Sequence, residues 1–239
     1  MRGLLITGTG TGVGKTILGA ALLAAMAATG ERVRAHKPVL TGLDESGLDG
    51  WPPDHKLLAA AAGMHAEEVA PLRYGVAASP QLAAALAGER IEPARLVAAA
   101  GAAHGERTLI VEGVGGLLTP FADRFAVREL AAALALPVLI AARPGLGTIN
   151  HTLLTLEAAR DAALDVRAIV LTPWPARPSV LERSNRETIA RVGAVAVAGL
   201  GPVRAPEPRE LARAGARLPW RQWLAAPAAS EPSAALRIA

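Results

Sequence analysis

The residues best suited to chemistry in this sequence stand near its start, in the segment TGTGTGVGKT at positions 7–16. It follows an apolar run at 4–6, and a glycine-rich turn before a helix points backbone N–H groups into a concavity that binds phosphate. Lys15 would bring a mobile cation to the outer phosphates, and the Thr16 hydroxyl would reach a magnesium ion. Five residues, one more than in a standard P-loop, separate Gly8 from the glycine before the lysine. The segment therefore predicts an enlarged phosphate-binding loop.

Two acidic residues are candidate partners for such a magnesium ion. Glu112 ends the strand expected over residues 108–111 and is itself followed by glycines, which permit close backbone approach. Asp54 follows a polar loop rich in Gly and Pro at 42–53. Mg²⁺ takes one or two carboxylates together with phosphate oxygens and water, so Thr16, Asp54 and Glu112 form a candidate metal site. For Asp54 the alternative is helix N-capping, and the two roles are compatible.

Two further segments carry candidate binding groups. Lys37 stands where a second strand should end, and a lysine facing the phosphate loop would neutralise charge that develops as a phosphoryl group moves. The alternative for Lys37 is a solvated loop lysine. The sequence GLGTINHT at 145–152 is a glycine turn that opens a helix, whose N–H groups and Asn150 would hold a carboxylate. Simple helix capping by Thr148 is the alternative there.

Alternating strands and helices must position these groups. Strands are expected at 3–7, within 31–38, at 107–112, 137–142, 166–172 and 194–199. Helices are expected at 15–29, 54–62, 80–87, 93–104, 126–135, 149–163, 178–192 and 207–215. Continuous Val/Ile/Leu strands between helices predict one α/β domain over 1–239, a doubly wound, mostly parallel sheet of the P-loop NTPase type with helices on both faces. We expect residues from about 225 to 239 to form a poorly ordered tail.

Composition narrows the classes of function. The chain has 239 residues, 51% of them hydrophobic and only 3% aromatic, and its net charge of +4 comes from scattered arginines. Because no Lys/Arg run is interleaved with aromatic residues, we expect no nucleic-acid partner, and anionic small molecules fit better. Zero cysteines exclude disulfides, thiolate metal sites and a cysteine nucleophile. The apolar start is too short for a signal peptide, and the apolar region 130–142 is too short to span a bilayer, so no membrane association and a cytoplasmic location are expected.

Together, the segments TGTGTGVGKT, HKPVLTG, VEGVGGLLTP and GTINHTLLTLEA resemble the dethiobiotin synthetase family, in order, over roughly residues 3–200. The resemblance implies a homodimer that binds ATP, Mg²⁺, CO₂ or bicarbonate, and 7,8-diaminononanoate, with the diaminononanoate lying across the subunit interface. It also implies that a substrate amine takes up CO₂ as a carbamate. The γ-phosphate of ATP then activates the carbamate as a carbamic-phosphoric anhydride, and the second amine closes the ring of dethiobiotin.

The resemblance also assigns residues by position. The catalytic set is Lys37, Lys15 and Thr11. The nucleotide-binding set is Gly8, Gly12, Val13, Gly14, Lys15, Thr16, Ile17, Asp54, Glu112, Gly113, Val114, Gly115, Thr172 and Pro173. The substrate-binding set is Thr41, Gly145, Leu146, Gly147, Thr148 and Asn150, the last five supplied by the partner subunit. The metal set is Thr16, Asp54 and Glu112.

The sequence departs from the family at the base, and two other classes share parts of the pattern. Many members carry Asn where this chain has Thr172-Pro173, so weak selection of adenine among nucleoside triphosphates is expected; residues 201–206 would close over the base. One alternative is a partitioning or site-selection ATPase, a nucleotide-dependent dimer switch, but such proteins have a second lysine where this chain has Thr9-Gly10. The other is an amidoligase of cobalamin synthesis, which is longer and has a glutaminase part that needs a cysteine.

Overall fold

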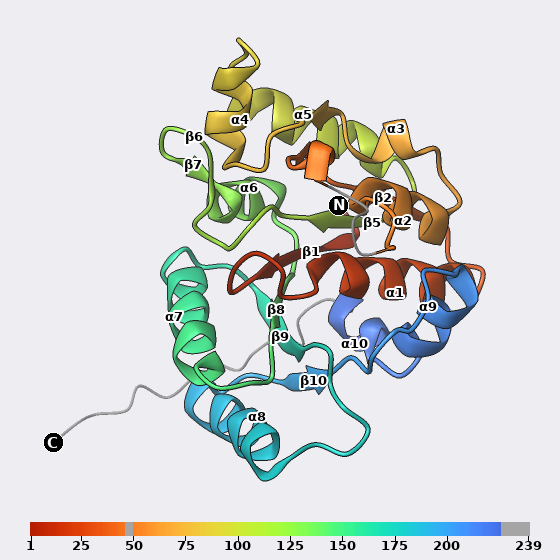
Figure 1. Cartoon of the computed structure of the whole chain (residues 1–239), viewed down its shortest axis with the longest axis vertical. Coiled ribbons are helices and arrows are strands. Elements are labelled where there is room, and N and C mark those ends of the chain that lie inside the picture. Colours follow the sequence, from red (N-terminus) through yellow and green to blue (C-terminus); the bar gives the residue numbers. More distant parts are fainter. Residues whose placement is uncertain (46–49, 226–239) are drawn as a thin grey trace, which may run out of the picture.

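A parallel sheet forms the centre of this computed structural model, which describes residues 1–45 and 50–225 (Figure 1). Within those residues the sheet has six strands. Their order across the sheet is β10 (Val197–Gly199), β9 (Val166–Leu171), β8 (Val138–Ala142), β1 (Gly3–Gly8), β5 (Thr108–Glu112) and β2 (Val33–His36). Each neighbouring pair is parallel. The chain places β2 and β5 on one side of β1 and β8 to β10 on the other, which confirms the predicted doubly wound α/β fold.

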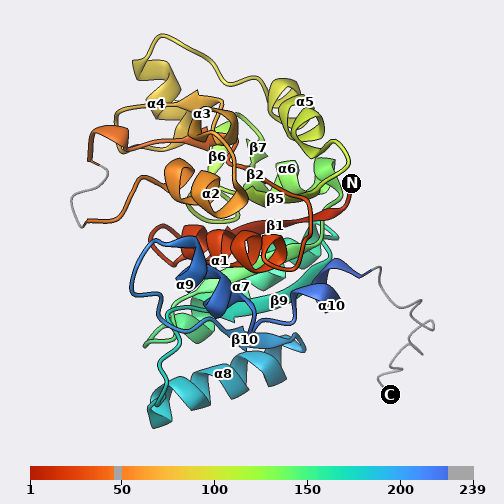
Figure 2. The ribbon, with the colours of Figure 1, turned by 90° about the vertical axis from the view of Figure 1, so that its right-hand side faces the viewer.

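Helices cover both faces of the sheet, because alternate apolar residues of each strand point to opposite sides. The face that includes Ile6 and Ile110 packs against α1 (Lys15–Ala27), α2 (Asp54–Ala62), α9 (Pro208–Gly215) and α10 (Trp220–Leu224). The face that includes Leu5 and Val111 packs against α5 (Pro93–His104), α6 (Val127–Leu134), α7 (Thr148–Asp161) and α8 (Val180–Gly193). Figure 2 shows the resulting layers, with the sheet between two sets of helices. The central strands are therefore buried on both faces.

Helix α1, which starts at the end of the phosphate loop, is buried along most of its length. It lies between α2 and α9 (Figure 2), and its buried residues include Lys15, Leu18, Leu22 and Met26. Helix α9 approaches very closely, since a Cβ on Gly215 would lie 2.0 Å from the carbonyl oxygen of Ala21. The helix that supports the loop is thus held by neighbours on several sides.

Short elements escaped the sequence analysis because each is too small to show a hydrophobic period. They are β3 (Val39–Leu40) paired with β4 (Leu72–Arg73), β6 (Pro120–Ala122) paired with β7 (Phe125–Ala126), the 3₁₀ turn η1 (Leu43–Glu45), and α3 (Ala66–Val69). Helix α10 was also missed, although it buries Trp220 and Trp223. The helix predicted at 80–87 is present as α4 (Pro80–Leu86).

Some predicted boundaries were wrong. The strand predicted from 194 begins at Val197, because Ala194 is the left-handed cap of α8 with φ 42°. Helix α1 ends at Ala27 rather than at residue 29. The predicted tail lies outside the described residues from 226 onward, as do residues 46–49 of the predicted loop. None of the helices found in the described part of the chain is both long and apolar enough to cross a bilayer.

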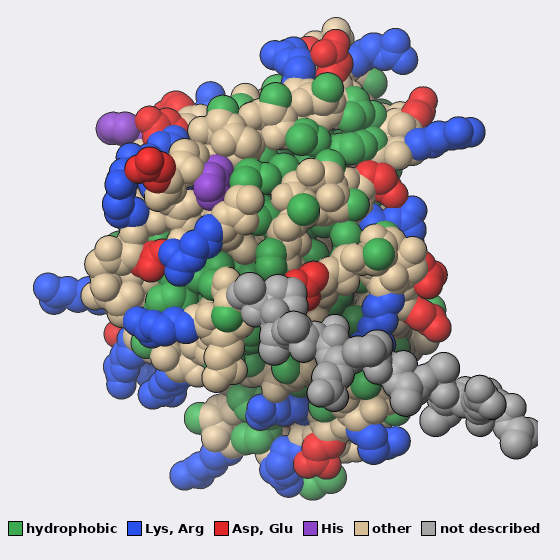
Figure 3. Space-filling view, turned by 180° about the vertical axis from the view of Figure 1, so that it is seen from behind, with side chains coloured by type: hydrophobic (Ala, Val, Ile, Leu, Met, Phe, Trp, Pro, Cys, Tyr) green, Lys and Arg blue, Asp and Glu red, His purple; other side chains and the backbone are tan. Residues whose placement is uncertain are grey.

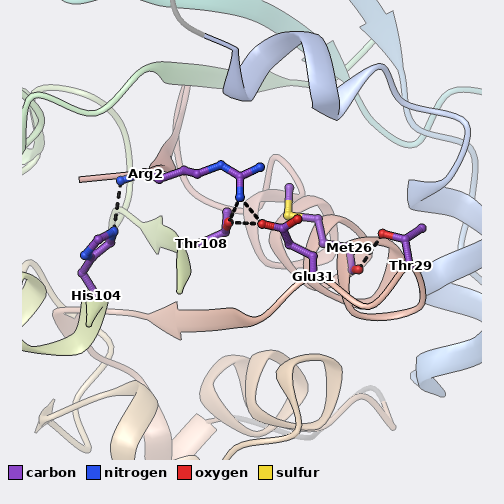
Figure 4. A network of polar contacts seen from close by, with 6 residues as sticks. All are labelled: Arg2, Met26, Thr29, Glu31, His104 and Thr108. Carbon is purple, nitrogen blue, oxygen red and sulfur yellow. Dashed lines mark hydrogen bonds and ion pairs between the residues drawn. The ribbon is translucent and has the colours of Figure 1, made fainter. Parts of the chain in front are cut away.

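A polar network joins the amino ends of β1 and β5 at the edge of the sheet opposite the phosphate loop (Figure 4). The Arg2 guanidinium contacts Glu31 and donates to the Thr108 hydroxyl at 3.0 Å, while the Thr108 hydroxyl donates to Glu31 at 2.6 Å. The Arg2 backbone N–H donates to His104 Nε2 at 3.0 Å. These contacts fix the start of the two strands whose other ends carry the phosphate loop and Glu112.

Charged side chains are spread over the back of the molecule as seen in Figure 3 rather than gathered in one place. On the face seen in Figure 3, Lys and Arg side chains alternate with Asp and Glu and with apolar patches. This distribution agrees with the scattered arginines of the sequence.

Candidate active site

Two glycines of the phosphate loop have backbone conformations that favour glycine. Gly12 and Gly14 adopt the left-handed region, with φ 71° and 89°. A Cβ on Gly14 would also lie 2.7 Å from the Cγ2 methyl of Thr172. The loop is tied to the strand ends on either side, since the Thr9 backbone N–H donates to the Ala141 carbonyl at 3.0 Å and Thr9 forms an antiparallel bridge with Gly116. The loop is thus a fixed cradle at the carboxyl end of β1.

Lys15 lies back across this loop. Its side chain is largely buried, and its ammonium group donates to the Gly10 carbonyl at 2.8 Å. Burial lowers the pKa of Lys15, and the carboxylate of Glu112 partly opposes that shift. The cation is therefore already positioned at the loop and needs only to exchange a carbonyl for a phosphate oxygen.

Lys37, Asp54, Glu112 and Thr16 form one cluster at the ends of β2 and β5. Lys37 Nζ lies 2.5 Å from Asp54 Oδ2 and 2.6 Å from Glu112 Oε1, and the lysine is only 4% exposed. The Thr16 hydroxyl donates to the same Glu112 oxygen at 2.9 Å. The alternative of a solvated loop lysine is wrong for Lys37, because its charge is buried between two carboxylates.

The charges of this cluster determine each other's ionisation. Burial alone would lower the pKa of Lys37, but Glu112 and Asp54 outweigh it and hold that pKa above its ordinary value. Burial raises the pKa of Glu112, and Lys37 opposes this. Burial also acts to raise the pKa of Asp54, but attraction to Lys37 and hydrogen bonds from Lys37 and Thr16 leave that pKa lowered. A divalent cation that binds here would therefore compete with Lys37 for the two carboxylates.

The same cluster fits the predicted metal site. Glu112 Oε2 is buried and has no hydrogen-bond partner among the described residues, so one carboxylate oxygen is left for a further ligand. Asp54 is the first residue of α2, and Pro53 holds the N-cap position without a side-chain cap, so the capping alternative for Asp54 is wrong. In the described part of the chain no group of three or more His, Asp or Glu side chains is arranged for a metal. Two carboxylates and a hydroxyl match a magnesium ion that also binds phosphate and water.

A cavity of about 960 Å³ opens over the loop and the cluster. The predicted residues that line it are Thr11, Gly12, Gly14, Lys15, Thr16, Ile17, Lys37, Thr41, Asp54, Glu112, Val114, Gly115, Thr172 and Pro173. Gly201, Pro202 and Val203, from the segment expected to close over the base, also line it. Gly8, Val13 and Gly113 lie beside the cavity wall without lining it; a Cβ on Gly113 would lie 2.6 Å from Val127 Cγ1, so this glycine serves close packing.

Sequence reasoning missed several residues of the cavity wall. They are Leu40, Trp51, Pro52, Leu57, Ala77, Ala78, Ser79, Pro80, Thr119 and Arg143. Most are apolar and come from segments without a motif, so no sequence signal marked them. Arg143 is different, because it directly follows strand β8. The rule that ligands bind at the carboxyl ends of parallel strands could have singled it out.

The turn at 145–150 does not line this cavity. Gly147 and Asn150 line a second cavity of about 620 Å³ between α7 and α8, and Leu146 is 92% exposed. The turn is braced from α8, since the Asn185 amide donates to the carbonyls of Pro144 and Gly145 at 2.9 and 3.0 Å. Gly147 holds the N-cap position of α7, so capping by Thr148 is wrong.

Comparison with known proteins gives a consistent group of relatives. A family model described as an AAA domain matches residues 2–206. The ATP-dependent dethiobiotin synthetase of Anaeromyxobacter dehalogenans (strain 2CP-1) is 44% identical over 174 residues, 72% of this chain and 76% of the relative. The synthetase of the same name from Mycobacterium sp. (strain JLS) is 38% identical over 231 residues, 94% of this chain and 99% of the relative. The Bacillus velezensis synthetase is 34% identical over 84% of this chain and 87% of the relative.

Among solved structures, the chain resembles the cell division protein FtsY from Thermotoga maritima. The identity is 14% and the TM-score is 0.48, over 89% of this chain and 67% of that chain.

Proposed function

Because the chain belongs to the family of ATP-dependent dethiobiotin synthetases, we propose that it closes the ureido ring of dethiobiotin from 7,8-diaminononanoate and CO₂, with ATP as the source of energy. The observation that carries the proposal is the buried contact of Lys37 with Asp54 and Glu112 beside the phosphate loop. This arrangement joins a nucleotide cradle to a cation that can follow a moving phosphoryl group. It lies in the wall of the cavity of about 960 Å³.

The reaction has three balanced steps. One amine of the substrate adds to CO₂ and loses a proton, which forms a carbamate. A carbamate oxygen then attacks the γ-phosphorus of ATP, so that ADP leaves and a carbamic-phosphoric anhydride forms. The second amine attacks the carbonyl carbon, phosphate leaves, and a further proton is released as the ring closes.

The protein's own groups act by position and charge. Lys15 and the loop N–H groups bind the phosphates, with Thr11 beside them in the cavity wall. Lys37 stabilises the negative charge of the carbamate and of the phosphoryl group during transfer. Thr41, which lines the same cavity, donates its hydroxyl to the carbamate. Little covalent chemistry is required of the side chains, because positioning and electrostatic stabilisation dominate phosphoryl transfer.

Thr16, Asp54 and Glu112 would hold magnesium, which supplies positive charge to the phosphate oxygens when it is bound. The three side chains already lie together, and the unpartnered Glu112 oxygen supports this role. Lys37 now contacts both carboxylates, so competition for these carboxylates would release its ammonium group toward the substrates.

We further propose a homodimer in which each subunit supplies the turn at 145–150 to its partner's site. Two features support this dimer. The turn does not line the cavity of its own chain, and Leu146 in the turn and Leu154 in the following helix are strongly exposed. Leu154 and Val192 also line or border the second cavity beside α7, which gives that surface an apolar character. The backbone N–H groups of the turn and Asn150 would then receive the substrate carboxylate.

Selection of the nucleobase is expected to be weak. Thr172 is 3% exposed and packs against Gly14, which leaves it poorly placed to read a base edge. Pro173 has no N–H donor. GTP and CTP should therefore replace ATP with modest loss in kcat/KM, and an ATP preference of about a thousandfold, or about 4 kcal/mol, would contradict this.

Because the reaction depends on ATP, we place the protein in the cytoplasm.

The proposal is tested by incubating the protein with the diamine, bicarbonate and Mg-ATP. Formation of dethiobiotin by mass spectrometry, with one ADP released per ring closed, is the expected result. ATP turnover that is indifferent to the diamine, without a ureido product, would instead favour a nucleotide-dependent switch of the same fold.

A further inference from the structure

Arg143 is a charged residue of the cavity wall to which no role has yet been assigned. It follows the last residue of β8 and reaches across to the phosphate loop, where Nη2 and Nε donate to the Gly12 carbonyl at 2.7 and 3.1 Å. β8 is the neighbour of β1 in the sheet, so the arginine approaches the loop from the side away from Glu112. Arg143 is exposed, and its guanidinium therefore remains accessible from the cavity.

The contact of Arg143 resembles that of Lys15. Lys15 donates to the carbonyl of Gly10, and Arg143 donates to the carbonyl of Gly12, two residues farther along the same loop. The lysine of a phosphate loop serves the β- and γ-phosphates, so this stretch of the loop borders the terminal phosphoryl group. Both cations are thus held on neutral carbonyls beside the place where negative charge is to be bound.

The charged side chains of the cavity wall also favour the binding of a phosphoryl group by Arg143. The charged side chains among its described lining residues are Lys15, Lys37, Arg143, Asp54 and Glu112. The two carboxylates contact Lys37, whereas the hydrogen bonds of Arg143 go to a neutral oxygen. A guanidinium has five N–H donors in a planar fork that matches the oxygens of a phosphoryl group. Arg143 therefore brings a positive charge that no carboxylate among the described lining residues contacts.

Gly12 lies in the left-handed region with φ 71°, and a Cβ there would be in ordinary van der Waals contact with Nη2 of Arg143, at 3.6 Å. The guanidinium therefore lies directly against the loop backbone at this position. The cation that contacts Gly12 thus comes from the residue directly after β8, the strand that pairs with β1.

We propose that Arg143 binds the terminal phosphoryl group of the nucleotide from within the same chain and favours triphosphate over diphosphate. The inference deepens the proposed function and rests on it only for the nucleotide site, because the binding of nucleotide can be measured without the diamine. In the loaded site the guanidinium exchanges the Gly12 carbonyl for oxygens of the γ-phosphoryl group. Its charge then also opposes the negative charge that spreads over those oxygens during transfer.

The test is equilibrium binding of a non-hydrolysable Mg-ATP analogue and of Mg-ADP, by calorimetry, to Arg143→Gln and to the parent protein. A hydrogen bond to a charged group contributes about 1.5–3 kcal/mol, so the affinity for the triphosphate should fall by roughly ten- to a hundredfold. The affinity for ADP should change by less than about threefold, because ADP lacks the γ-phosphoryl group. Arg95→Gln, which removes the same charge from an exposed site on α5, should leave both affinities unchanged.

Equal losses for the two nucleotides would overturn the proposal, since they would show that Arg143 only supports the loop through Gly12. Unchanged affinity for the triphosphate would overturn it as well. Arg143→Lys retains charge but not the fork, so it should retain part of the preference for triphosphate even if Arg143→Gln folds poorly. If Arg143→Lys lost as much affinity for the triphosphate as Arg143→Gln, or lost none, the planar two-donor contact assigned to the guanidinium would be contradicted. Absence of ureido product in the synthetase assay would leave these binding results unaffected.

Discussion

At the scale of single residues, Lys37 offers the most direct test of the reaction chemistry. Lys37→Met removes the charge and keeps much of the side-chain volume. Because this charge acts mainly on the transition state, kcat and kcat/KM should fall together by about 10²–10³-fold. Steady-state kinetics with saturating Mg-ATP measure the effect. A normal kcat with only a raised KM would make Lys37 a binding residue instead.

The same substitution should also change stability, because it leaves Glu112 buried without its cation. Glu112 is 1% exposed, and breaking a buried pair costs about 3–5 kcal/mol. Lys37→Met should therefore unfold at a clearly lower temperature than the parent protein. Lys56→Met, which removes an exposed lysine from α2, is the matched control and should unfold near the parent temperature. Equal unfolding temperatures for the two variants would show that the ion pairs contribute little.

His36 gives the protein a predictable dependence on pH. The side chain is 2% exposed, and burial, with a smaller contribution from Arg34, lowers its pKa from 6.5 to about 4. The unfolded chain therefore binds more protons between these values, and stability should decrease as pH falls through 6.5 and level off below 4. The contribution from this one group is about 3 kcal/mol.

Urea unfolding of His36→Leu at several pH values tests this dependence. The variant should lose less stability than the parent between pH 6.5 and 4, because it has no buried imidazole to protonate. His65→Gln, a change at an exposed histidine, should keep the parental slope. A parental slope in His36→Leu would place the pH dependence on other groups.

At the scale of elements, the docking of α9 on α1 depends on Gly215. A Cβ there would lie 2.0 Å from the Ala21 carbonyl, so Gly215→Ala must push the two helices apart. Overpacking of this kind typically costs about 1–3 kcal/mol. The segment before α9 lines the nucleotide cavity at Gly201 to Val203, so a raised KM for ATP should accompany the loss.

Gly101 supplies a control with the opposite sign. It lies within α5, and apart from its chain neighbours and the backbone of that helix no described atom lies within 4 Å of an added Cβ. Gly101→Ala should therefore stabilise the protein by about 0.5–1 kcal/mol, because alanine is the better helix former. Chemical denaturation of both variants measures the difference. Similar effects of the two substitutions would mean that α9 is free to shift.

At the scale of the whole molecule, the proposed sharing of active sites between two subunits predicts complementation between inactive chains. In a mixed dimer of Lys37→Ala and Asn150→Ala subunits, one site would carry both defects and the other neither. Random mixing after unfolding and refolding should then restore about a quarter of the parental activity, since half of the dimers are mixed and half of their sites are intact. No recovery on mixing, or full activity in a monomer, would rule out the shared site.

The sequence by itself determined the sheet and the chemistry of its edge. Continuous apolar strands must be buried on both faces, so their alternation with helices fixed the parallel sheet, and the glycines before Lys15 fixed a phosphate loop. It also brought Lys37, Asp54 and Glu112 into consideration, because each stands at the end of an expected strand or at the start of an expected helix. These inferences depend on local order along the chain, which a sequence displays directly.

Only the tertiary structure decided which partners these groups have. That Lys37 is buried between Asp54 and Glu112 and that Arg143 reaches Gly12 depend on strand order, since β2, β5, β1 and β8 become neighbours through crossovers. The turn at 145–150 likewise does not line the cavity of its own chain. Short strands, the burial of α10 and the 2.0 Å approach at Gly215 were also beyond the sequence. Contacts between distant segments are set by how whole layers pack, and no periodicity within one segment records them.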